Sequence, residues 1–328
     1  MDMISFGTVF LELVFGQLHR LPAPGEEVFT NEFAISCGGA VTSATAAAAA
    51  GVLAGLCTRL GDDLGSQVVT EHSAAAGVDL SPSSRVDGAT AGITVVLNFD
   101  DDRGFVTHLP PSLAAGEDAE IERWRSVVRA ERPAWCYLHG GRRVPPFLRE
   151  ARALGCKIML DMSLGDERER DALIECVRLA DVFVPNAAEV LALTGAPDLA
   201  TAVGSAATWG AQLVVTRGVA GALVASPDGS VTEVAEGVQN VPVMDLTGAG
   251  DNFAGALIAA MIGGASVIDA VVAANAAGSR AVGMLGAVGE LAPEITGAGW
   301  PLRRMVVQDA AGVLAGANQP GGWSREKR

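Results

Sequence analysis

Short apolar runs alternate with helical patterns over most of this chain, and that alternation restricts the possible fold more than any other feature. The clearest apolar runs are Trp135–Leu138, Lys157–Leu160, Asp181–Val184 and Gln212–Thr216. Helical patterns follow the first three of them, over residues 146–153, 168–179 and 187–193. Strands that are apolar on both faces occur in parallel sheets that helices cover on both sides. The sequence therefore predicts an α/β fold with a doubly wound, mostly parallel sheet and right-handed crossovers.

Two segments, residues 12–36 and 89–111, break this pattern with a looser, extended alternation. In the second segment, polar residues 100–104 separate Ala91–Phe99 from Phe105–His108, which indicates a hairpin. We assign both segments to a small, partly exposed β-structure. Residues 1–11, 37–88 and 112–300 then form the α/β core, and residues 301–328 are predicted to be a C-terminal extension that is partly disordered.

The composition excludes several classes of protein. The 328 residues are 49% hydrophobic, which permits a sizeable core, and the net charge is −15. Proteins that bind nucleic acids or anionic membranes usually carry basic surfaces, so we expect neither as a partner. The five cysteines lack C-x-x-C spacing, which indicates buried, reduced thiols. Because the sequence shows neither a basic leader nor an apolar stretch suited to a membrane span, we expect a cytoplasmic protein.

The segment Asp245–Asp251 carries the strongest chemical signal. It reads Asp-Leu-Thr-Gly-Ala-Gly-Asp, and an amphipathic helix begins directly after it. Backbone N–H groups of Gly248, Ala249 and Gly250 can point at one spot there, where the helix N-terminus adds partial positive charge. That spot suits a phosphate, and Asp251 at its rim is placed to orient an attacking hydroxyl. The alternative is a glycine-rich turn with Asp251 as a helix cap, but the added Asp245 and Thr247 favour phosphoryl transfer.

Other polar residues have two interpretations each. Asn186 and Glu189 lie one helical turn apart at a strand–helix junction, where they could face phosphates or form a capping box. His139 follows the strand Trp135–Leu138, at the carboxyl end where ligands gather, but it could equally be an ordinary loop histidine. Arg103 at the hairpin turn is read as a solvent-exposed charge rather than a pocket residue.

Taken in chain order with Asp245–Asp251, six further segments resemble the signatures of the ribokinase-like (PfkB) sugar kinases. They are residues 21–26 (P-x-x-G-E), Gly38–Gly39 with the Ala-rich run after them, residues 59–65 (G-x-D-x-x-G), 76–79 (G-V-D), 186–189 (N-x-x-E) and 215–221 (V-T-x-G-x-x-G). Each motif is weak alone, but the ordered set is specific and extends over residues 3 to about 290. The resemblance implies a ribokinase-like fold in which segments 12–36 and 89–111 form a β-lid.

The resemblance also implies the nucleotide site of an ATP-dependent carbohydrate kinase. Asp251 would be the base, and the Gly248–Gly250 amides would hold the transferred phosphoryl group. The resemblance also implies that the nucleotide is contacted by Thr216, Gly218, Gly221, Thr247 and Asn275. Asn275 could equally be an ordinary polar helix position. Asn186 and Glu189 would organise Mg²⁺ through water, and Asp245 resembles a ligand of a monovalent cation such as K⁺.

The sugar pocket implied by the resemblance consists of Glu12, Gly38, Gly39, Ser43 and His139. The chain departs from the family pattern at three positions. Ser43 stands where Asn is usual, Glu12 where Asp is usual, and Leu246 where a small polar residue is common. The first two departures bear on the identity of the sugar rather than on the transfer chemistry. A lid of this kind has exposed edges and apolar faces, so a homodimer through the lid is expected.

Two alternatives stay open. A nucleoside kinase of the same fold would need an aromatic-rich pocket, and only 5% of the residues are aromatic. A non-catalytic sugar-sensing protein would be expected to lose the base or the anion hole, and both are intact. A Rossmann dehydrogenase and a P-loop kinase are disfavoured, because the chain has neither an early G-x-G-x-x-G nor a G-x-x-x-x-G-K-[ST] motif.

Overall fold

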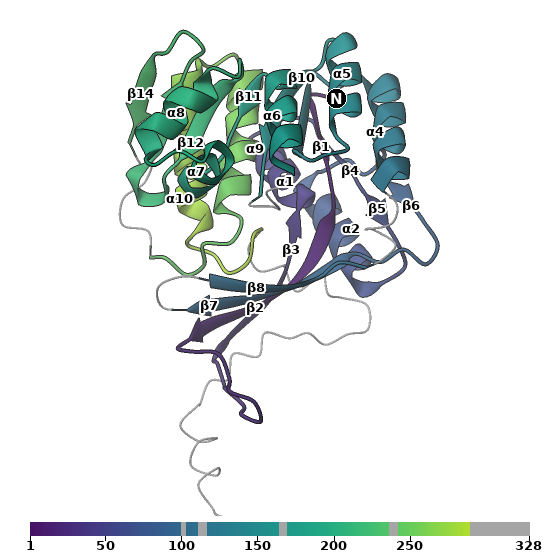
Figure 1. Cartoon of the computed structure of the whole chain (residues 1–328). Coiled ribbons are helices and arrows are strands. Elements are labelled where there is room, and N and C mark those ends of the chain that lie inside the picture. The colour runs from purple at the N-terminus through teal and green to yellow at the C-terminus, as the bar shows by residue number, and fades with distance from the viewer. Residues whose placement is uncertain (100–102, 111–116, 164–168, 236–241, 289–328) are drawn as a thin grey trace, which may run out of the picture.

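The computed structural model describes residues 1–99, 103–110, 117–163, 169–235 and 242–288. An eight-stranded sheet in the order β14-β13-β12-β11-β10-β9-β1-β4 forms its centre (Figure 1). These strands are β1 (Met3–Phe6), β4 (Ala54–Cys57), β9 (Trp135–His139), β10 (Lys157–Asp161), β11 (Val182–Phe183), β12 (Gln212–Thr216), β13 (Ala222–Ala225) and β14 (Val231–Val234). All neighbours pair in parallel except β12–β13 and β13–β14, so the predicted mostly parallel sheet is confirmed.

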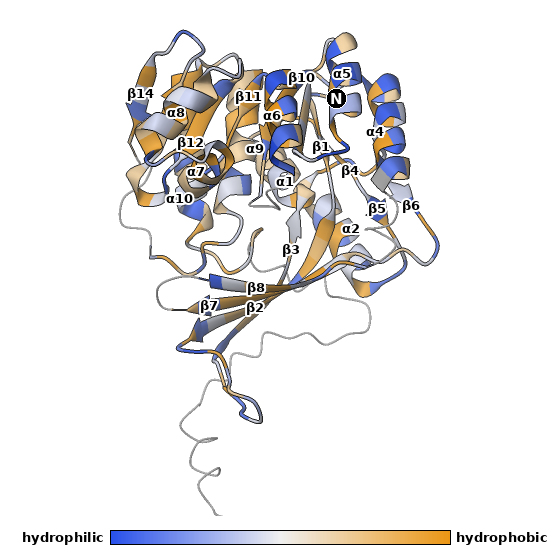
Figure 2. Cartoon of the chain, in the orientation of Figure 1, coloured by the Kyte–Doolittle hydropathy of each residue, from blue (hydrophilic) through white to orange (hydrophobic). Residues whose placement is uncertain are grey.

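Helices cover both faces of this sheet. One face packs against α1 (Ala40–Ala49), α9 (Ala249–Ile262) and α10 (Val267–Ala281). The other packs against α4 (Glu117–Glu131), α5 (Pro145–Ala153), α6 (Arg170–Leu179), α7 (Ala187–Thr194) and α8 (Leu199–Ala207). Successive residues of β9 enter opposite cores: Tyr137 joins the α9 side and Leu138 the α4–α8 side. The central strands are accordingly mostly apolar (Figure 2), which confirms the doubly wound fold.

A second sheet, the lid, extends from the body in the order β3-β2-β7-β8 (Figure 1). Its strands are β2 (Val9–Leu18), β3 (Glu32–Gly39), β7 (Gly92–Phe99) and β8 (Arg103–His108). β2 and β7 pair in parallel, and β7 and β8 form the predicted hairpin, whose turn residues 100–102 lie outside the described residues. β2 begins at Val9, before the predicted boundary at residue 12, because only Gly7 and Thr8 separate it from β1.

The connection between body and lid is covered by α2 (Leu64–Ala76), which packs against β2 and β3, and by the short pair β5 (Arg59–Leu60) and β6 (Ser84–Arg85). Farther from the body, the outer face of the lid is exposed. It presents Phe33, Ile93 and Val106, whose side chains are 48%, 39% and 63% exposed. The division into core and lid by residue number stays a prediction, and residues 289–328, including the predicted extension 301–328, lie outside the described residues.

All five cysteines are buried and free, as the sequence predicted. Within the described residues, no single helix combines the length and the apolar character needed to cross a membrane, whereas the bent pair α7–α8 meets those two criteria jointly.

Candidate active site

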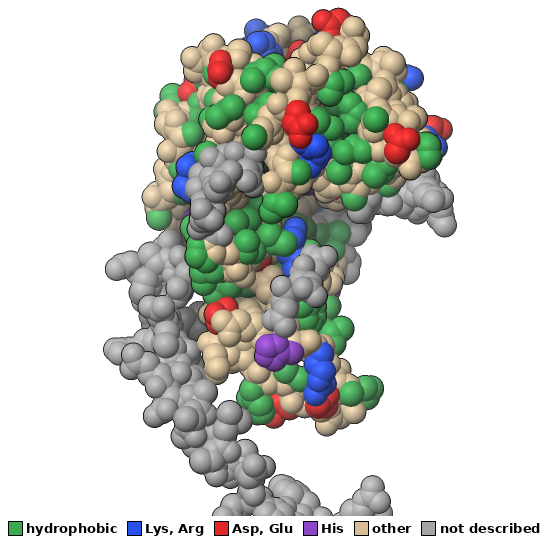
Figure 3. All heavy atoms as spheres, turned by 90° about the vertical axis from the view of Figure 1, so that its left-hand side faces the viewer, with side chains coloured by type: hydrophobic (Ala, Val, Ile, Leu, Met, Phe, Trp, Pro, Cys, Tyr) green, Lys and Arg blue, Asp and Glu red, His purple; other side chains and the backbone are tan. Residues whose placement is uncertain are grey.

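A cavity of about 900 Å³ lies between the carboxyl ends of the central strands and the inner face of the lid. The space-filling view shows the molecule narrowing where body and lid meet (Figure 3). Most of the residues singled out from the sequence line this cavity: Glu12, Gly39, His139, Asn186, Glu189, Thr216, Gly218, Thr247, Gly248, Ala249, Gly250 and Asp251. Gly38, Ser43, Gly221, Asp245 and Asn275 do not belong to the lining.

The start of α9 supplies a row of backbone donors to the cavity. The first helical hydrogen bond runs from the N–H of Asn252 to the carbonyl of Gly248 at 2.9 Å, so the N–H groups of Gly250 and Asp251 precede the helical ladder. The N–H of Ala249 makes only a long bond, 3.4 Å, to the carbonyl of Leu246. The buried Oγ1 of Thr247 has no hydrogen-bond partner within the described residues. This arrangement suits an anion, which would accept from these groups.

Asp245 stabilises the turn before α9 by accepting hydrogen bonds from two backbone N–H groups. Its carboxylate accepts from the N–H of Thr247 and from the N–H of Gly286, each at 2.8 Å, and only 2% of the residue is exposed. Gly248 adopts φ 73°, and a methyl group there would lie 2.6 Å from Cα of Ala287. The side-chain amide of Asn252 donates to the carbonyls of Gly248 and Ala287 at 2.8 and 2.9 Å. The turn and the segment around Ala287 are therefore locked together.

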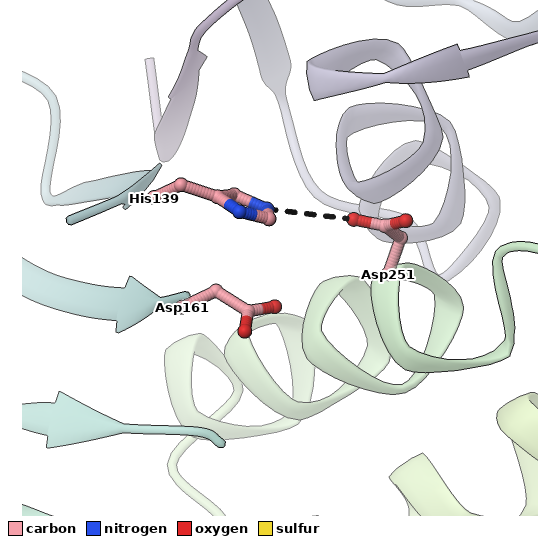
Figure 4. Close-up of side chains that lie close together, drawn as sticks. All are labelled: His139, Asp161 and Asp251. Atoms are coloured by element: carbon pink, nitrogen blue, oxygen red, sulfur yellow. Dashed lines mark ion pairs between the residues drawn. The ribbon is translucent and has the colours of Figure 1, made fainter. Parts of the chain in front are cut away.

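Asp251 lies in the first turn of α9, facing the ends of β9 and β10 (Figure 4). Its Oδ1 is 4.0 Å from Nε2 of His139 and 3.4 Å from the hydroxyl of Tyr137. That hydroxyl donates to Oδ2 of Asp161 at 2.8 Å. Oxygen and nitrogen atoms of His139, Asp161 and Asp251 all lie within 4.8 Å of one another. The site thus gathers two carboxylates, an imidazole and a phenol at one end of the cavity.

The ionisable side chains at this end of the cavity shift one another's pKa values. Burial alone would lower the pKa of His139, but the carboxylates of Asp251 and Asp161 more than offset it and raise that pKa to about 9. The imidazolium form of His139 is therefore favoured at neutral pH. Burial also raises the pKa of Asp161, although the His139 charge opposes the shift. Burial and the two neighbouring carboxylates raise the pKa of Tyr137, so its phenol keeps its proton.

Asn186 and Glu189 form a complete capping box at the start of α7, so the structural alternative weighed from the sequence is present. The N–H of Glu189 donates to Oδ1 of Asn186 at 2.9 Å, and the N–H of Asn186 donates to Oε2 of Glu189 at 2.8 Å. Both residues nevertheless line the cavity. Burial raises the pKa of Glu189 to about 7, although the Asn186 N–H opposes the shift. A hydrated cation fits beside this carboxyl, because one of its oxygens is not used by the cap.

Glu12 stands on the inner face of the lid, opposite Ser36 on β3 and Thr94 on β7. It is 6% exposed, and burial raises its pKa to about 7, against the effect of the Ala287 N–H that donates to Oε2 at 3.3 Å. Gly38 is needed behind it, because a methyl group at that position would overlap Oε1 of Glu12.

The remaining predicted residues lie away from the cavity. Ser43 is fully buried in α1, where its hydroxyl contacts Oγ of Ser5 at 3.1 Å and donates to the carbonyl of Ala40 at 3.3 Å. The amide of Asn275 donates to the carbonyl of Ala235 at 2.7 Å. Gly221 ends the short 3-10 helix Gly218–Ala220 with φ 74°. None of these contacts tests the proposed roles in ligand binding, which stay predictions.

Sequence reasoning missed several lining residues. Arg103 was read as a solvent-exposed turn charge, yet it stands on the cavity wall, 5.6 Å from the ring of Phe105. Five aromatic residues also line the cavity: Phe6, Phe10, Phe105, Trp124 and Tyr137. Low aromatic content therefore does not argue against a pocket for a planar group. Asp161 follows an apolar strand in the same way as His139, and that signal would have identified it.

The chain is similar in sequence to known proteins. A profile of the family described as "pfkB family carbohydrate kinase" matches residues 3–293. A cytidine kinase from Thermococcus kodakarensis is 28% identical over 272 residues, which cover 79% of this chain and 88% of the relative.

Two solved structures show the same fold. A protein from E. coli, solved in complex with ATP and Mg²⁺, superposes with a TM-score of 0.74 at 23% identity, over 88% of this chain and 94% of that one. Arabidopsis thaliana ribokinase, complexed with ribose and ATP, gives a TM-score of 0.70 at 23% identity over the same shares.

Proposed function

The chain belongs to the pfkB family of carbohydrate kinases, and from this premise we propose that it transfers the γ-phosphoryl group of ATP to a hydroxyl of a small carbohydrate. The observation that carries this proposal is the start of α9. Its residues line the cavity beside Asp251, and the N–H groups of Gly250 and Asp251 precede the helical hydrogen bonds, which supports an anion hole there. An anion hole next to a carboxylate is the minimum that phosphoryl transfer to an alcohol requires.

The proposed mechanism assigns the chemistry to few groups. Asp251 orients the acceptor hydroxyl and takes its proton. A loose transition state needs little early deprotonation, so positioning and charge stabilisation supply most of the rate. The N–H groups of Gly250 and Asp251 and the hydroxyl of Thr247 stabilise the charge that develops on the transferred group. When bound, Mg²⁺ would neutralise phosphate charge, and Glu189 and Asn186 are the residues that would hold it through water.

The lid supports the same function. Glu12 would accept from hydroxyl groups of the acceptor on the inner face of the lid, with His139 donating from the opposite side. Closing the lid would exclude water, which otherwise competes for the phosphoryl group. The exposed outer face of the lid further supports a homodimer formed through it.

A nucleoside is the second candidate for the acceptor. Phe10 and Phe105 of the lid line the cavity, and rings of this kind stack on a planar base. The cytidine kinase relative supports the same alternative. A sensor without catalysis is supported less, because Asp251 and the Gly248–Gly250 turn proposed as base and anion hole both line the cavity.

The decisive experiment measures ADP release over a panel of sugars and nucleosides, with Asp251→Asn as the matched variant. We expect one acceptor class to turn over, and kcat to fall about 10²- to 10⁴-fold in the variant with little change in KM for ATP. If nothing on the panel turns over above the variant's background, the kinase proposal gives way to the sensor.

We also propose that a monovalent cation such as K⁺ binds near Asp245. This residue already accepts two backbone N–H groups, so removing it disturbs the anion hole with or without a cation. A rate that rises with K⁺ in the wild type, but not with Na⁺ or in Asp245→Ala, would support the proposal. A wild-type rate that is the same in K⁺ and in Na⁺ would remove the cation and leave Asp245 as an anchor of the turn.

A further inference from the structure

Behind Asp251 lie a buried phenol and a second carboxyl that the proposed mechanism leaves without a role. Tyr137 is the only tyrosine of the chain and stands in the middle of the apolar strand β9, 1% exposed, with its ring in the core beside α9. Its hydroxyl reaches the cavity end of that core, where it contacts Oδ2 of Asp161 at 2.8 Å and Oδ1 of Asp251 at 3.4 Å. A buried hydroxyl is costly unless it is paired, so these contacts fix its position.

The single phenol proton faces two carboxyl groups. It can be given to only one of them at a time. If Asp161 is ionised, the phenol donates to Asp161 and turns a lone pair toward Asp251. If Asp161 carries a proton, it donates to the phenol oxygen, and the phenol can donate to Asp251. Burial favours the protonated form, because it raises the pKa of Asp161.

Within the described residues, the polar contacts of the Asp251 side chain involve one of its two carboxylate oxygens, Oδ1. Tyr137 and His139 both approach its Oδ1, at 3.4 and 4.0 Å. His139 is in turn oriented by Ser163, whose Oγ lies 3.2 Å from Nδ1. Within the residues that the structure describes, Oδ2 of Asp251 has no hydrogen-bond partner, although Asp251 lines the cavity. Oδ1 therefore faces these two protein groups, whereas Oδ2 is available to an acceptor hydroxyl.

We propose that Tyr137 and Asp161 are positioning residues that fix the side-chain conformation of Asp251, holding Oδ1 through the phenol so that Oδ2 is presented to the acceptor. The inference rests on the proposed role of Asp251 as the base. A carboxylate anchored at one oxygen loses rotational freedom before the acceptor arrives. This matters because a displacement of about 1 Å at such a group can lower the rate 100-fold.

The first test compares kcat among three variants. Tyr137→Phe removes only the hydroxyl, and we expect kcat to fall about 10- to 100-fold while KM for ATP changes less than about threefold. Asp161→Ala should lose a similar factor. Asp161→Asn should regain most of that loss, because its amide can donate to the phenol oxygen permanently while its carbonyl oxygen accepts the N–H of Met162, as Oδ1 of Asp161 does at 2.7 Å. Equal losses in Asp161→Asn and Asp161→Ala would overturn the proposal.

A double variant separates positioning from a merely structural role. If both residues act through Asp251, Tyr137→Phe with Asp161→Ala should be no slower than the slower single variant. Additive losses would contradict the inference. Thermal unfolding of every variant checks that the fold is intact.

The pH profile of kcat supplies a further readout. As pH rises and Asp161 ionises, the phenol turns its O–H from Asp251 to Asp161, so kcat should fall with this ionisation in the wild type but not in Asp161→Asn. Glu12 also titrates near Asp251 in both proteins. Asp161→Asn removes a charge that raises the pKa values of His139 and Glu189, so these two groups should titrate at lower pH in the variant and cannot by themselves abolish a fall in kcat with rising pH. Identical pH profiles of kcat in the two proteins would exclude the role of Asp161.

A comparison of crystal structures of the wild type and Tyr137→Phe tests the inference even if the protein phosphorylates no acceptor on the panel. We expect Asp251 to occupy one conformer in the wild type and to rotate or split into several conformers in Tyr137→Phe. An unchanged single conformer in the variant would overturn the proposal. If the wild type phosphorylates no acceptor, the proposed function fails, but this structural comparison still decides whether Tyr137 positions Asp251.

Discussion

Glu12 is expected to bind the acceptor, but burying its ionised carboxyl lowers the stability of the folded protein. The residue is buried under the lid, and its pKa is raised from 4.5 to about 7. The folded state therefore prefers the protonated form. Because the pKa is higher in the folded than in the unfolded chain, the stabilising contribution is complete below about pH 4.5 and is lost as pH rises through about 7.

We predict that Glu12→Gln is more stable than the wild type at pH 8, by about 3 kcal/mol, and equally stable near pH 4. The variant keeps the size and hydrogen-bonding capacity of the side chain but cannot ionise. Urea unfolding at both pH values measures the difference. The exposed Glu27→Gln changes the net charge by the same amount and should show no such pH dependence. A constant difference between Glu12→Gln and wild type at all pH values would contradict the prediction.

The residues of the site differ in how far the sequence could reveal them. Asp251 and His139 were found because a motif or a strand end marks them. Tyr137 carries no such signal, since a tyrosine inside a four-residue apolar run reads as core. Its hydroxyl partners lie 24 and 114 residues farther along the chain, so only the folded structure reveals the contact. The pairing of Asp161 with Asp251 is hidden for the same reason.

At the scale of elements, the close approach of α1 and α9 explains the Ala-rich run after Gly39. A methyl group at Gly255 of α9 would lie 2.7 Å from Cβ of Ala46, so small residues are required on both helices. Ser43 lies on this buried side of α1, with its hydroxyl bonded inside the protein rather than at the cavity. The family motif located the helix correctly, but which way each side chain faces depends on how the two helices pack.

The glycines at the start of α9 should differ sharply in tolerance. We predict that Gly248→Ala destabilises the protein by about 2 kcal/mol or more and lowers kcat, because φ is positive there and the methyl group would overlap Ala287. Gly250→Ala is the matched control. Its methyl group meets nothing within 4 Å, so helix propensity should make the variant as stable as the wild type or up to about 1 kcal/mol more stable. Chemical denaturation measures both, and equal stabilities for the two variants would contradict the prediction.

At the scale of the whole molecule, the alternation of elements and the order of the motifs were sufficient to predict the body and its lid. The apolar runs indicated buried parallel strands, and the structure has them. The pairing of β2 with β7 in parallel was not predictable, because these strands lie about 80 residues apart and neither carries a signal of its partner. Which aromatic side chains line the cavity is likewise a property of the assembled chain rather than of its composition.

We predict that the protein is a dimer through the outer face of the lid and that Val106→Lys weakens this dimer at least about tenfold. The side chain of Val106 is 63% exposed in an apolar setting, and a charge placed in a buried interface costs more than the contact it replaces. Sedimentation velocity at several concentrations measures the change. Leu53→Lys is the control, since Leu53 is 70% exposed on the body beside β4 rather than on the lid. A wild-type chain that stays monomeric at every concentration tested would refute the prediction.

The burial of all five cysteines gives the experimenter a protein that is ready for site-specific labelling. A cysteine introduced at an exposed point of the lid would be the thiol that a maleimide reaches first, so the native residues need not be replaced. A fluorophore or spin label attached there would report the travel of the lid over the body as nucleotide and acceptor are added, in solution and one ligand at a time.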